Sequence, residues 1–331
     1  MTDRTITRAD IEKTQKAIAG WVIETPVVRW RGREIEAGTG PGTEVWLKLE
    51  LFQVSGSFKA RGALNNLLAL SQAARDKGVT AISAGNHAIA VAFAAAEFGV
   101  SAKVVMPRTA NPFRVARCEA LGAVVVLMDD VVKAFEEVKR IEAEEGRTFV
   151  HPFEGFETIC GTATVGLELL RQRPDLEAIV VPVGGGGLIS GIARAAALVK
   201  PDCAVYGVEP EGAPTLTKSL AAGEPQAIDA VRTIADSLGA PHAMPMSFGL
   251  IRDHVERIVL VDDGALMSAM ARLFAERKLA VEPASAASTA ALLGPLKDEL
   301  AGKRVALIVS GANIDIAGFA GHVEAGLENP R

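Results

Sequence analysis

The sequence predicts an α/β fold in which open, twisted parallel sheets carry helices on both faces. Three observations support it. Short runs rich in Val and Ile alternate with helix-patterned segments, the helical segments stop at Gly or Pro, and polar or glycine-rich turns follow several strands. Such alternation gives parallel strands covered by helices. A chain of 331 residues is long enough for two domains or for one large one.

Eight strands are expected, each a short apolar run bounded by turn residues. They are Glu44–Leu49, Val79–Ser83, Ala102–Met106, Val124–Met128, Ala178–Val183, Ala204–Val208, Arg257–Val261 and Arg304–Val309. Between them, segments such as HAIAVAFAAAEFG and LISGIARAAALVK are rich in Ala and helical in period. The sequence shows no internal repeat and no low-complexity tract, so composition alone gives no domain boundary.

Composition and charge narrow the class of protein. A chain with 49% hydrophobic residues, 23% charged residues and 32 glycines is typical of a soluble enzyme. The net charge of −5, the single Tyr and the three Trp argue against nucleic acid or an anionic membrane as a partner. The N-terminus has no apolar signal core. Cys118, Cys160 and Cys203 lack metal-type spacing, so we expect buried thiols in a cytoplasmic protein.

Glycine-rich and polar loops stand where open sheets bind ligands, beyond the carboxyl ends of strands. Four successive glycines, Gly184–Gly187, join the strand AIVVPV to a helix. Without side chains, their N–H groups can approach an anion closely, and the helix N-terminus adds positive potential. We therefore predict a phosphate site at this loop. The turn Ser83–His87 and the strand end at Ser310 and Gly311 occupy equivalent places.

Lys59 opens a predicted helix in SGSFKARGAL, where the helix dipole disfavours an ammonium group. If the side chain is half-buried there, its pKa falls below the reference value of about 10.4 and part of the amine is neutral. A neutral lysine amine is a nucleophile, and its commonest use is a Schiff base. The alternative for this residue taken alone is a solvated surface lysine.

These segments, SGSFKARGAL, SAGNHA, PVGGGGL and VSGAN in that order, closely resemble the fold-type II pyridoxal-phosphate enzymes, and among them the serine/threonine dehydratase and serine racemase branch. The resemblance covers nearly the whole chain and implies a two-domain, tryptophan-synthase-β-like fold. Residues 1–50 and 152–331 would form the large cofactor-binding domain, and residues 51–151 the small one. The resemblance also implies a homodimer and pyridoxal 5′-phosphate as the cofactor.

The same resemblance implies a role for each residue around the cofactor. Lys59 would hold the cofactor as a Schiff base, with Phe58 against the ring. Asn86 would bond to the ring 3-hydroxyl, and Ser310 would face the pyridine nitrogen. The phosphate would be bound by Gly184, Gly185, Gly186 and Gly187.

On the substrate side, the resemblance implies that Ser83, Asn86 and His87 hold the carboxylate through side chains and backbone amides. Glu282 would lie near the substrate amine and the ring. Two alternatives stay open from the residues themselves. His87 could cap the helix that follows it, and Glu282 could be a structural carboxylate at a helix start.

A serine at the pyridine nitrogen favours β-elimination. Unlike a carboxylate, the Ser310 hydroxyl cannot keep that nitrogen protonated, so the ring is a weaker electron sink and electrons released at Cα expel a β-leaving group. The implied reaction converts a β-hydroxy amino acid to a 2-oxo acid and ammonia, with Lys59 as general base. L-Threonine and L-serine are the expected substrates. His242, in the loop Ser237–Gly249, could instead pair with a second carboxylate and make 3-hydroxyaspartate the substrate.

Several positions depart from the pattern of this branch. Ala84 stands where its racemases resemble SSGNHG and carry a proton-donating serine, so efficient racemisation is not expected. Glu209 and Ala213 match two ligands of a divalent-metal site, but Thr215 is a poorer ligand than the usual Asp, so a metal stays only an alternative. Ile89 replaces a frequent glutamine without a predicted consequence. The chain ends about twenty residues after its last strand, too few for an added regulatory domain.

Two other classes are weaker interpretations. A sulfhydrylase-type transferase would resemble TSGNTG rather than SAGNHA at the asparagine turn. A non-catalytic binding protein would need neither Lys59 nor a phosphate loop.

Overall fold

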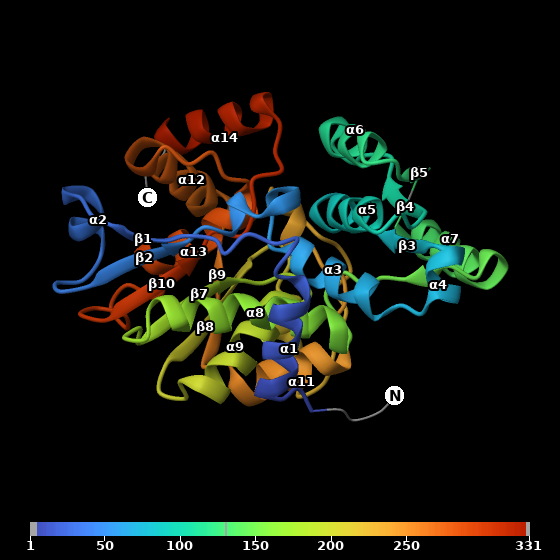
Figure 1. The fold of residues 1–331 in the computed structure, drawn as a ribbon. Coiled ribbons are helices and arrows are strands. Elements are labelled where there is room, and N and C mark those ends of the chain that lie inside the picture. Colours follow the sequence, from blue (N-terminus) through green and yellow to red (C-terminus); the bar gives the residue numbers. More distant parts are fainter. Residues whose placement is uncertain (1–4, 130, 329–331) are drawn as a thin grey trace.

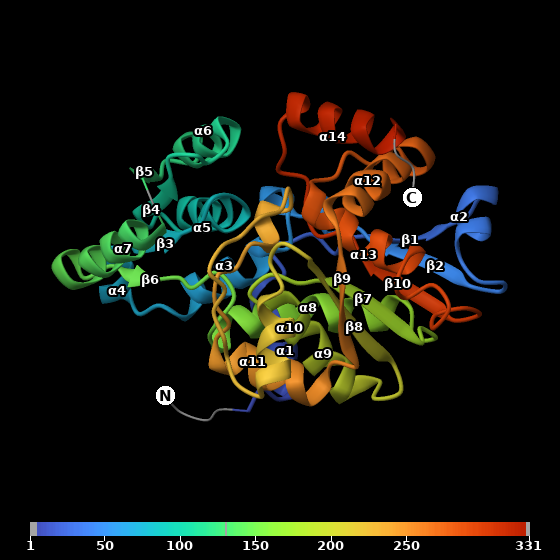
Figure 2. The ribbon, with the colours of Figure 1, turned by 180° about the vertical axis from the view of Figure 1, so that it is seen from behind.

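The computed structural model describes residues 5–129 and 131–328, and this part of the chain folds around two sheets (Figures 1 and 2). The larger sheet has the strand order β1-β2-β10-β7-β8-β9, and the smaller one has the order β5-β4-β3-β6. Every strand pair is parallel except the antiparallel pair of β1 and β2. The predicted parallel α/β architecture is confirmed.

The eight predicted strands are all present, with ends that differ from the predicted ones by two residues at most. The larger sheet contains β1 (Val27–Trp30), β2 (Glu44–Lys48), β7 (Ala178–Pro182), β8 (Ala204–Pro210), β9 (Arg257–Val261) and β10 (Arg304–Ile308). The smaller sheet contains β3 (Val79–Ile82), β4 (Ala102–Pro107), β5 (Val124–Met128) and β6 (Thr148–Phe149). The sequence pattern missed β1 and β6, since both are too short to show a periodicity.

Helices connect the strands and cover both sheets (Figure 1). They are α1 (Arg8–Ile18), α2 (Arg33–Gly38), α3 (Lys59–Ala69), α4 (Gln72–Lys77), α5 (Asn86–Glu97), α6 (Pro112–Ala120), α7 (Val131–Glu145), α8 (Phe156–Gln172), α9 (Gly187–Val199), α10 (Thr215–Ala222), α11 (Pro245–His254), α12 (Asp263–Arg277), α13 (Pro283–Leu293) and α14 (Ile316–Glu328). Single 3-10 turns are η1 (Glu50–Phe52), η2 (Val54–Gly56) and η3 (Asp236–Leu238).

The larger sheet is buried on both faces, as an apolar parallel sheet must be. Along β7, Ala178 and Val180 point into a core shared with α12 and α13, whereas Ile179 and Val181 point into a core shared with α8 and α9. Figures 1 and 2 show these two helix layers on opposite sides of the sheet.

The smaller sheet is covered in the same way. In β4, Val104 packs with residues of α3 and α5, whereas its neighbour Val105 packs with residues of α7. Ile89, which replaces a frequent glutamine, is fully buried in the first of these cores. The division of the chain into domains stays a prediction; the strands of the smaller sheet lie between residues 79 and 149, and those of the larger sheet lie outside this stretch.

Buried charges anchor the helix that begins at Lys59. Arg61 donates to both oxygens of Glu50, at 2.8 and 2.9 Å, and to Glu168 at 3.0 Å. Lys48 also pairs with Glu168, and all four charged side chains are buried. Each charge is compensated only while its partners stay in place. The start of α3 is therefore held firmly against β2 and α8.

No helix in the described part of the chain combines the length and apolarity needed to cross a membrane. Cys118, Cys160 and Cys203 are buried, as predicted, and none of them forms a disulfide within the described residues.

Candidate active site

The residues for which the sequence predicts a cofactor role meet in one cavity at the carboxyl ends of β3, β7 and β10. Its lining includes Phe58, Lys59, Asn86, Gly184, Gly185, Gly186, Gly187, Glu282 and Ser310. These residues come from loops that lie up to 252 positions apart in the sequence, and the parallel topology brings them to one edge. Their individual roles stay predictions.

Lys59 is the first residue of α3, as predicted, and its Nζ donates a hydrogen bond to the carbonyl oxygen of Pro152. Burial of the amine lowers its pKa to about 8, while the negative charge of Glu282 acts in the opposite direction. Burial thus lowers this pKa, as the sequence predicts for a lysine that is at least half-buried at this helix start. Lys59 Nζ also lies 5.1 Å from the centre of the Phe58 ring.

The glycine loop fits a phosphate group. Within residues 5–129 and 131–328, no hydrogen bond uses the backbone N–H groups of Gly184–Gly187, which open α9. A Cβ on Gly185 would lie 2.2 Å from the Phe153 ring, and Gly186 has φ +90, so side chains are excluded here. Free N–H groups at a helix N-terminus form an anion site.

Asn86 and Glu282 are hydrogen-bonded to each other in the lining of the cavity. Asn86 Nδ2 donates to Glu282 Oε1 at 2.6 Å and to Ser237 Oγ at 3.3 Å. Burial raises the pKa of Glu282 to about 7, although Arg114 favours its charged form. Glu282 is the N-cap residue of α13 but its side chain makes no capping hydrogen bond there, so the structural alternative for this carboxylate stays open.

Ser310 lies in a network of neutral groups. Its hydroxyl is 3.0 Å from Ser285 Oγ, which in turn bonds to the N–H and the carbonyl of Gly311, both at 2.6 Å. No carboxylate bonds to this hydroxyl among the described residues. The hydroxyl for which the sequence predicts a place at the pyridine nitrogen is thus bonded to a neutral group. Sequence reasoning missed Ser285, which has no motif of its own in EPASAAS.

A larger cavity of about 720 Å³ opens beside Lys59 and contains the turn Ser83–His87. His87 Nε2 lies 2.7 Å from the Val150 carbonyl, and burial together with Lys59 lowers the pKa of His87 to about 3. The ring is therefore neutral and uses its one N–H on Val150, since a carbonyl only accepts. A substrate carboxylate would be left with the backbone N–H groups at the start of α5 and with Ser83.

Aromatic side chains line part of this cavity, and one of them, Phe153, also lines the smaller cavity with Lys59. The centres of the Phe135 and His242 rings are 5.6 Å apart, and those of Phe153 and His242 are 6.1 Å apart. His151 extends the cluster at 4.7 Å from Phe153. Burial lowers the pKa of His242, so its ring is neutral near pH 7. Phe135 and Phe153 carry no sequence signal that could have placed them here.

The residues of the possible metal site have other partners in the fold. Glu209 is buried and accepts hydrogen bonds from the N–H groups of Leu216 and Thr217, at 2.7 and 2.8 Å, at the start of α10. Thr215 donates to the carbonyl of Ala240 at 2.6 Å. In the described ranges, no group of three or more His, Cys, Asp or Glu side chains is arranged to hold a metal ion.

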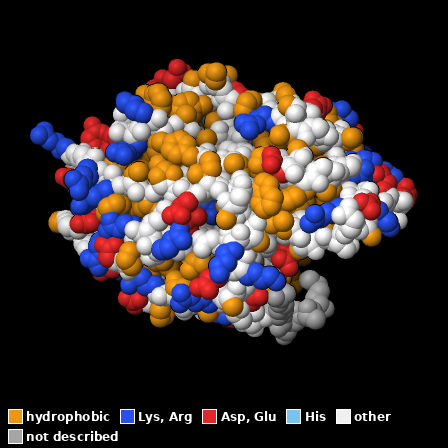
Figure 3. Space-filling view, in the orientation of Figure 1, with side chains coloured by type: hydrophobic (Ala, Val, Ile, Leu, Met, Phe, Trp, Pro, Cys, Tyr) orange, Lys and Arg blue, Asp and Glu red, His pale blue; other side chains and the backbone are white. Residues whose placement is uncertain are grey.

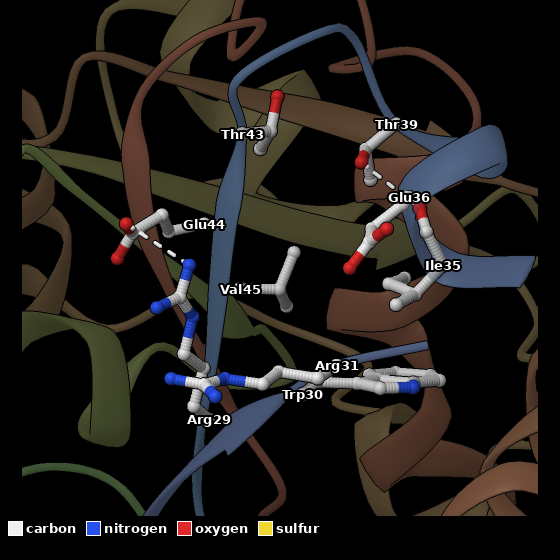
Figure 4. A pocket seen from close by; sticks show the side chains of 9 residues that line it. All are labelled: Arg29, Trp30, Arg31, Ile35, Glu36, Thr39, Thr43, Glu44 and Val45. Atoms are coloured by element: carbon white, nitrogen blue, oxygen red, sulfur yellow. Dashed lines mark hydrogen bonds and ion pairs between the residues drawn. The ribbon is translucent and has the colours of Figure 1, made fainter. Parts of the chain in front are cut away.

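Another cavity, of about 340 Å³, lies between β1, α2 and β2 at the edge of the larger sheet (Figure 4). Figure 4 shows Arg29 paired with Glu44, at 3.0 Å, on one side and the Trp30 ring below Val45. It shares no lining residue with the cavities around Lys59.

Comparison with known proteins agrees with this geometry. A family model described as pyridoxal-phosphate dependent enzyme matches residues 18–311. The chain belongs to this family. It is 52% identical to phenylserine dehydratase from Ralstonia pickettii over 92% of this chain and 93% of that one. It is 38% identical to L-threonine ammonia-lyase from Thermotoga maritima over 94% of this chain and 76% of that one.

The solved structure of maize serine racemase has a TM-score of 0.90 and 36% identity, covering 98% of this chain and 99% of that one. The fold is therefore that of the fold-type II pyridoxal-phosphate enzymes. The enzyme uses pyridoxal phosphate and is a lyase of the dehydratase and ammonia-lyase class, acting on carbon–oxygen bonds of amino acids.

Proposed function

We propose that this enzyme dehydrates β-hydroxy amino acids with an aromatic β-substituent, such as phenylserine, to a 2-oxo acid and ammonia. The observation that carries the proposal is the aromatic wall of Phe135, Phe153 and His242 in the cavity beside Lys59. The 52% identity to a phenylserine dehydratase supports it.

The wall suits an aryl group better than a methyl group. Aromatic pairs contribute about 0.5–1.5 kcal/mol beyond the burial of their surface. Ile228, Val231 and Pro241 add further apolar lining. L-Threonine and L-serine have the same reacting atoms, Cα and Cβ, and would also be substrates. Their smaller β-substituents, however, would not fill the space beside Phe135, Phe153 and His242.

The charges of the cavity disfavour a second carboxylate. Arg114 is already paired with Asp236, and one of these bonds measures 3.2 Å. Asp229 also lines the cavity, and His242 is neutral. Of the lining residues that the structure describes, only Lys59 is left as a cation without a carboxylate hydrogen-bonded to it. 3-Hydroxyaspartate, the alternative substrate, would therefore bury a charge without a partner.

Bound pyridoxal phosphate would supply a ring that withdraws electrons from the α-carbon of the substrate. The N–H groups of Gly184–Gly187 would bind its phosphate, and the neutral hydroxyl of Ser310 would face its nitrogen. Lys59 Nζ would accept the proton from Cα. The backbone N–H groups of Asn86 and His87, at the start of α5, would orient the substrate carboxylate. Loss of water gives an enamine, whose imine tautomer is hydrolysed to the 2-oxo acid and ammonia.

The substrate preference is tested by kcat/KM for L-threonine, L-serine and the diastereomers of phenylserine and 3-hydroxyaspartate, with ammonia and 2-oxo acid measured in parallel. We expect one phenylserine diastereomer to lead threonine by at least about tenfold, equivalent to about 1.4 kcal/mol. A faster reaction with threonine or with hydroxyaspartate would contradict the proposal.

We further propose a cytoplasmic homodimer. Cys118, Cys160 and Cys203 form no disulfide within the described residues, which supports a reducing compartment. Figure 3 shows apolar side chains gathered over α12 and α14, where Phe274, Ile316 and Leu327 are exposed and offer surface for a second copy. Light scattering tests the assembly; a monomer at micromolar concentration would contradict it.

A further inference from the structure

We propose that Asn313 is a positioning residue that decides which end of the Asn86 amide faces the cofactor ring. The inference rests on the proposed function and on the contact between Asn86 and the ring 3-hydroxyl that the family resemblance implies. Asn313 follows β10 in the VSGAN segment and is 2% exposed.

The hydrogen bonds of Asn313 leave its amide one orientation. Its Nδ2 donates to the backbone carbonyl of Ser55 at 2.9 Å and to Asn86 Oδ1 at 2.7 Å. Because a carbonyl only accepts, the NH2 end of Asn313 has to face Ser55. Because the same NH2 group also donates to Asn86, the end of the Asn86 amide that faces Asn313 has to be its oxygen. The NH2 end of Asn86 is thereby turned toward Glu282 and Ser237, into the cavity.

The loop before Lys59 is shaped around this contact. Ser55 has φ 64, a left-handed conformation that side chains rarely adopt, while its buried hydroxyl has no partner among the described residues. The hydroxyl therefore does not explain the conformation, and the polar contact that Ser55 makes here is that of its carbonyl with Asn313. Gly56 has φ 78, and a Cβ there would lie 2.6 Å from Asn313 Oδ1. Strain of this kind is characteristic of functional sites.

The backbone of Asn313 holds the same arrangement from the other side. Its carbonyl accepts from Arg114 Nε at 2.8 Å, and its N–H donates to the Glu282 carboxylate. Asn313 thus touches both Asn86 and Glu282, the two polar groups that would flank the ring.

The direction of the Asn86 amide has a chemical consequence. An N–H that points at the ring 3-oxygen stabilises the anionic form of that oxygen, whereas an amide oxygen at the same place would repel it. Asn313 therefore acts on the ionisation of the bound cofactor without touching it.

The test compares Asn313→Asp and Asn313→Ala with the parent. In Asn313→Asp the new carboxylate can only accept, so Asn86 has to turn its NH2 group toward it and its oxygen toward the ring. Three quantities are measured: the Kd of pyridoxal phosphate for the apoprotein, the pH titration of the absorbance of the bound cofactor, and the thermal midpoint of the apoprotein. Asn86→Asp serves as the benchmark for losing the N–H donor directly.

We expect Asn313→Asp to weaken cofactor binding by at least about tenfold and to move the absorbance titration in the same direction as Asn86→Asp. Asn313→Ala, which frees the Asn86 amide, should give a smaller shift of the same sign. If the Asn313→Asp variant does not fold, the shift measured for Asn313→Ala decides the inference by itself.

Asn66→Asp is the matched control. Asn66 Nδ2 also donates two hydrogen bonds, to the Gly62 carbonyl at 2.8 Å and to Thr158 Oγ1 at 2.9 Å, but it lines neither cavity. Its variant should lower the thermal midpoint and leave the titration unchanged. If Asn86→Asp shifts the titration and neither Asn313 variant does, the inference is overturned while the proposed function stands. If Asn86→Asp has no effect either, the ring does not lie beside Asn86 and the inference falls with that placement.

Discussion

The two walls of the active site are built differently. The wall to which we assign the cofactor consists of Gly184–Gly187 and Ser310, which follow β7 and β10, and of Lys59, the first residue of α3. The wall to which we assign the substrate consists of side chains from α7, the segment after β6 and the loop before α11: Phe135, Phe153 and His242, of which Phe153 also lines the cofactor cavity. Backbone groups are placed by the fold itself, so they depend on glycine and on topology. Side-chain walls depend on packing, and single substitutions can remodel them.

The largest expected loss of activity comes from replacing the proposed nucleophile, Lys59. Lys59→Ala should abolish turnover, because it removes the amine that would bind the cofactor and take the α-proton. Borohydride reduction of the parent followed by peptide mapping should label Lys59. A label on another lysine would show that the wall is assigned to the wrong residue.

The electron sink can be altered without touching the nucleophile. Ser310→Asp should protonate the pyridine nitrogen, slow elimination and increase long-wavelength absorbance during turnover, because the ring then retains electrons released at Cα. Ser310→Ala should be the milder change. Stopped-flow spectra with substrate measure both, and an aspartate variant that eliminates as fast as the parent would refute the argument from a neutral partner.

The glycine loop tests whether backbone space is essential. In Gly185→Ala the new Cβ would lie 2.2 Å from the Phe153 ring, so the loop or the ring must shift and the Kd of pyridoxal phosphate should rise; overpacking costs about 1–3 kcal/mol. Gly249→Ala in α11 is the control, because its Cβ would have no neighbour within 4 Å and the helix should gain stability. Equal cofactor affinity in both variants would contradict the cradle.

The substrate wall should respond selectively. Phe135→Ala should lower kcat/KM for phenylserine by about tenfold or more, since it removes an aromatic contact of about 0.5–1.5 kcal/mol in addition to buried area. The value for L-threonine and the spectrum of the bound cofactor should change little. A parallel loss for both substrates would mean that Phe135 supports the fold and not the specificity.

The smallest expected effect is on stability against pH. The pKa of His87 is lowered to about 3 in the folded protein from an ordinary value of 6.5, so between these values the unfolded chain binds the proton that the folded chain refuses. Stability should therefore fall as pH decreases from about 6.5, by up to about 1.4 kcal/mol per pH unit for this group. Glu282, with its raised pKa, acts in the opposite sense between pH 4.5 and about 7.

His87→Gln, which keeps an N–H donor for the Val150 carbonyl, should flatten this acid slope. Thermal midpoints of the apoprotein between pH 7 and pH 5 give the comparison. A slope identical to that of the parent would show that His87 is not the group that titrates.

Much of this architecture was readable from local pattern. The β-branched runs predicted eight of the strands, and the strand–glycine–helix pattern at Gly184–Gly187 predicted an anion site, because both depend on neighbouring residues along the chain. Lys59 was identified on its motif. The degree of burial that lowers its pKa was not, since it depends on what packs around the amine in three dimensions.

The sequence by itself thus determined the strand and helix alternation, the glycine loop between β7 and α9, and the place of Lys59 at the start of α3, for which backbone geometry and short-range pattern suffice. Three contacts were decided only by the tertiary structure. The His87 ring N–H donates to the Val150 carbonyl, the neutral His242 ring packs against Phe135, and the Asn313 amide donates to the oxygen of Asn86. These contacts join residues between 63 and 227 positions apart. Their burial and hydrogen-bond direction arise when separate loops meet at one sheet edge, and no local pattern encodes that meeting.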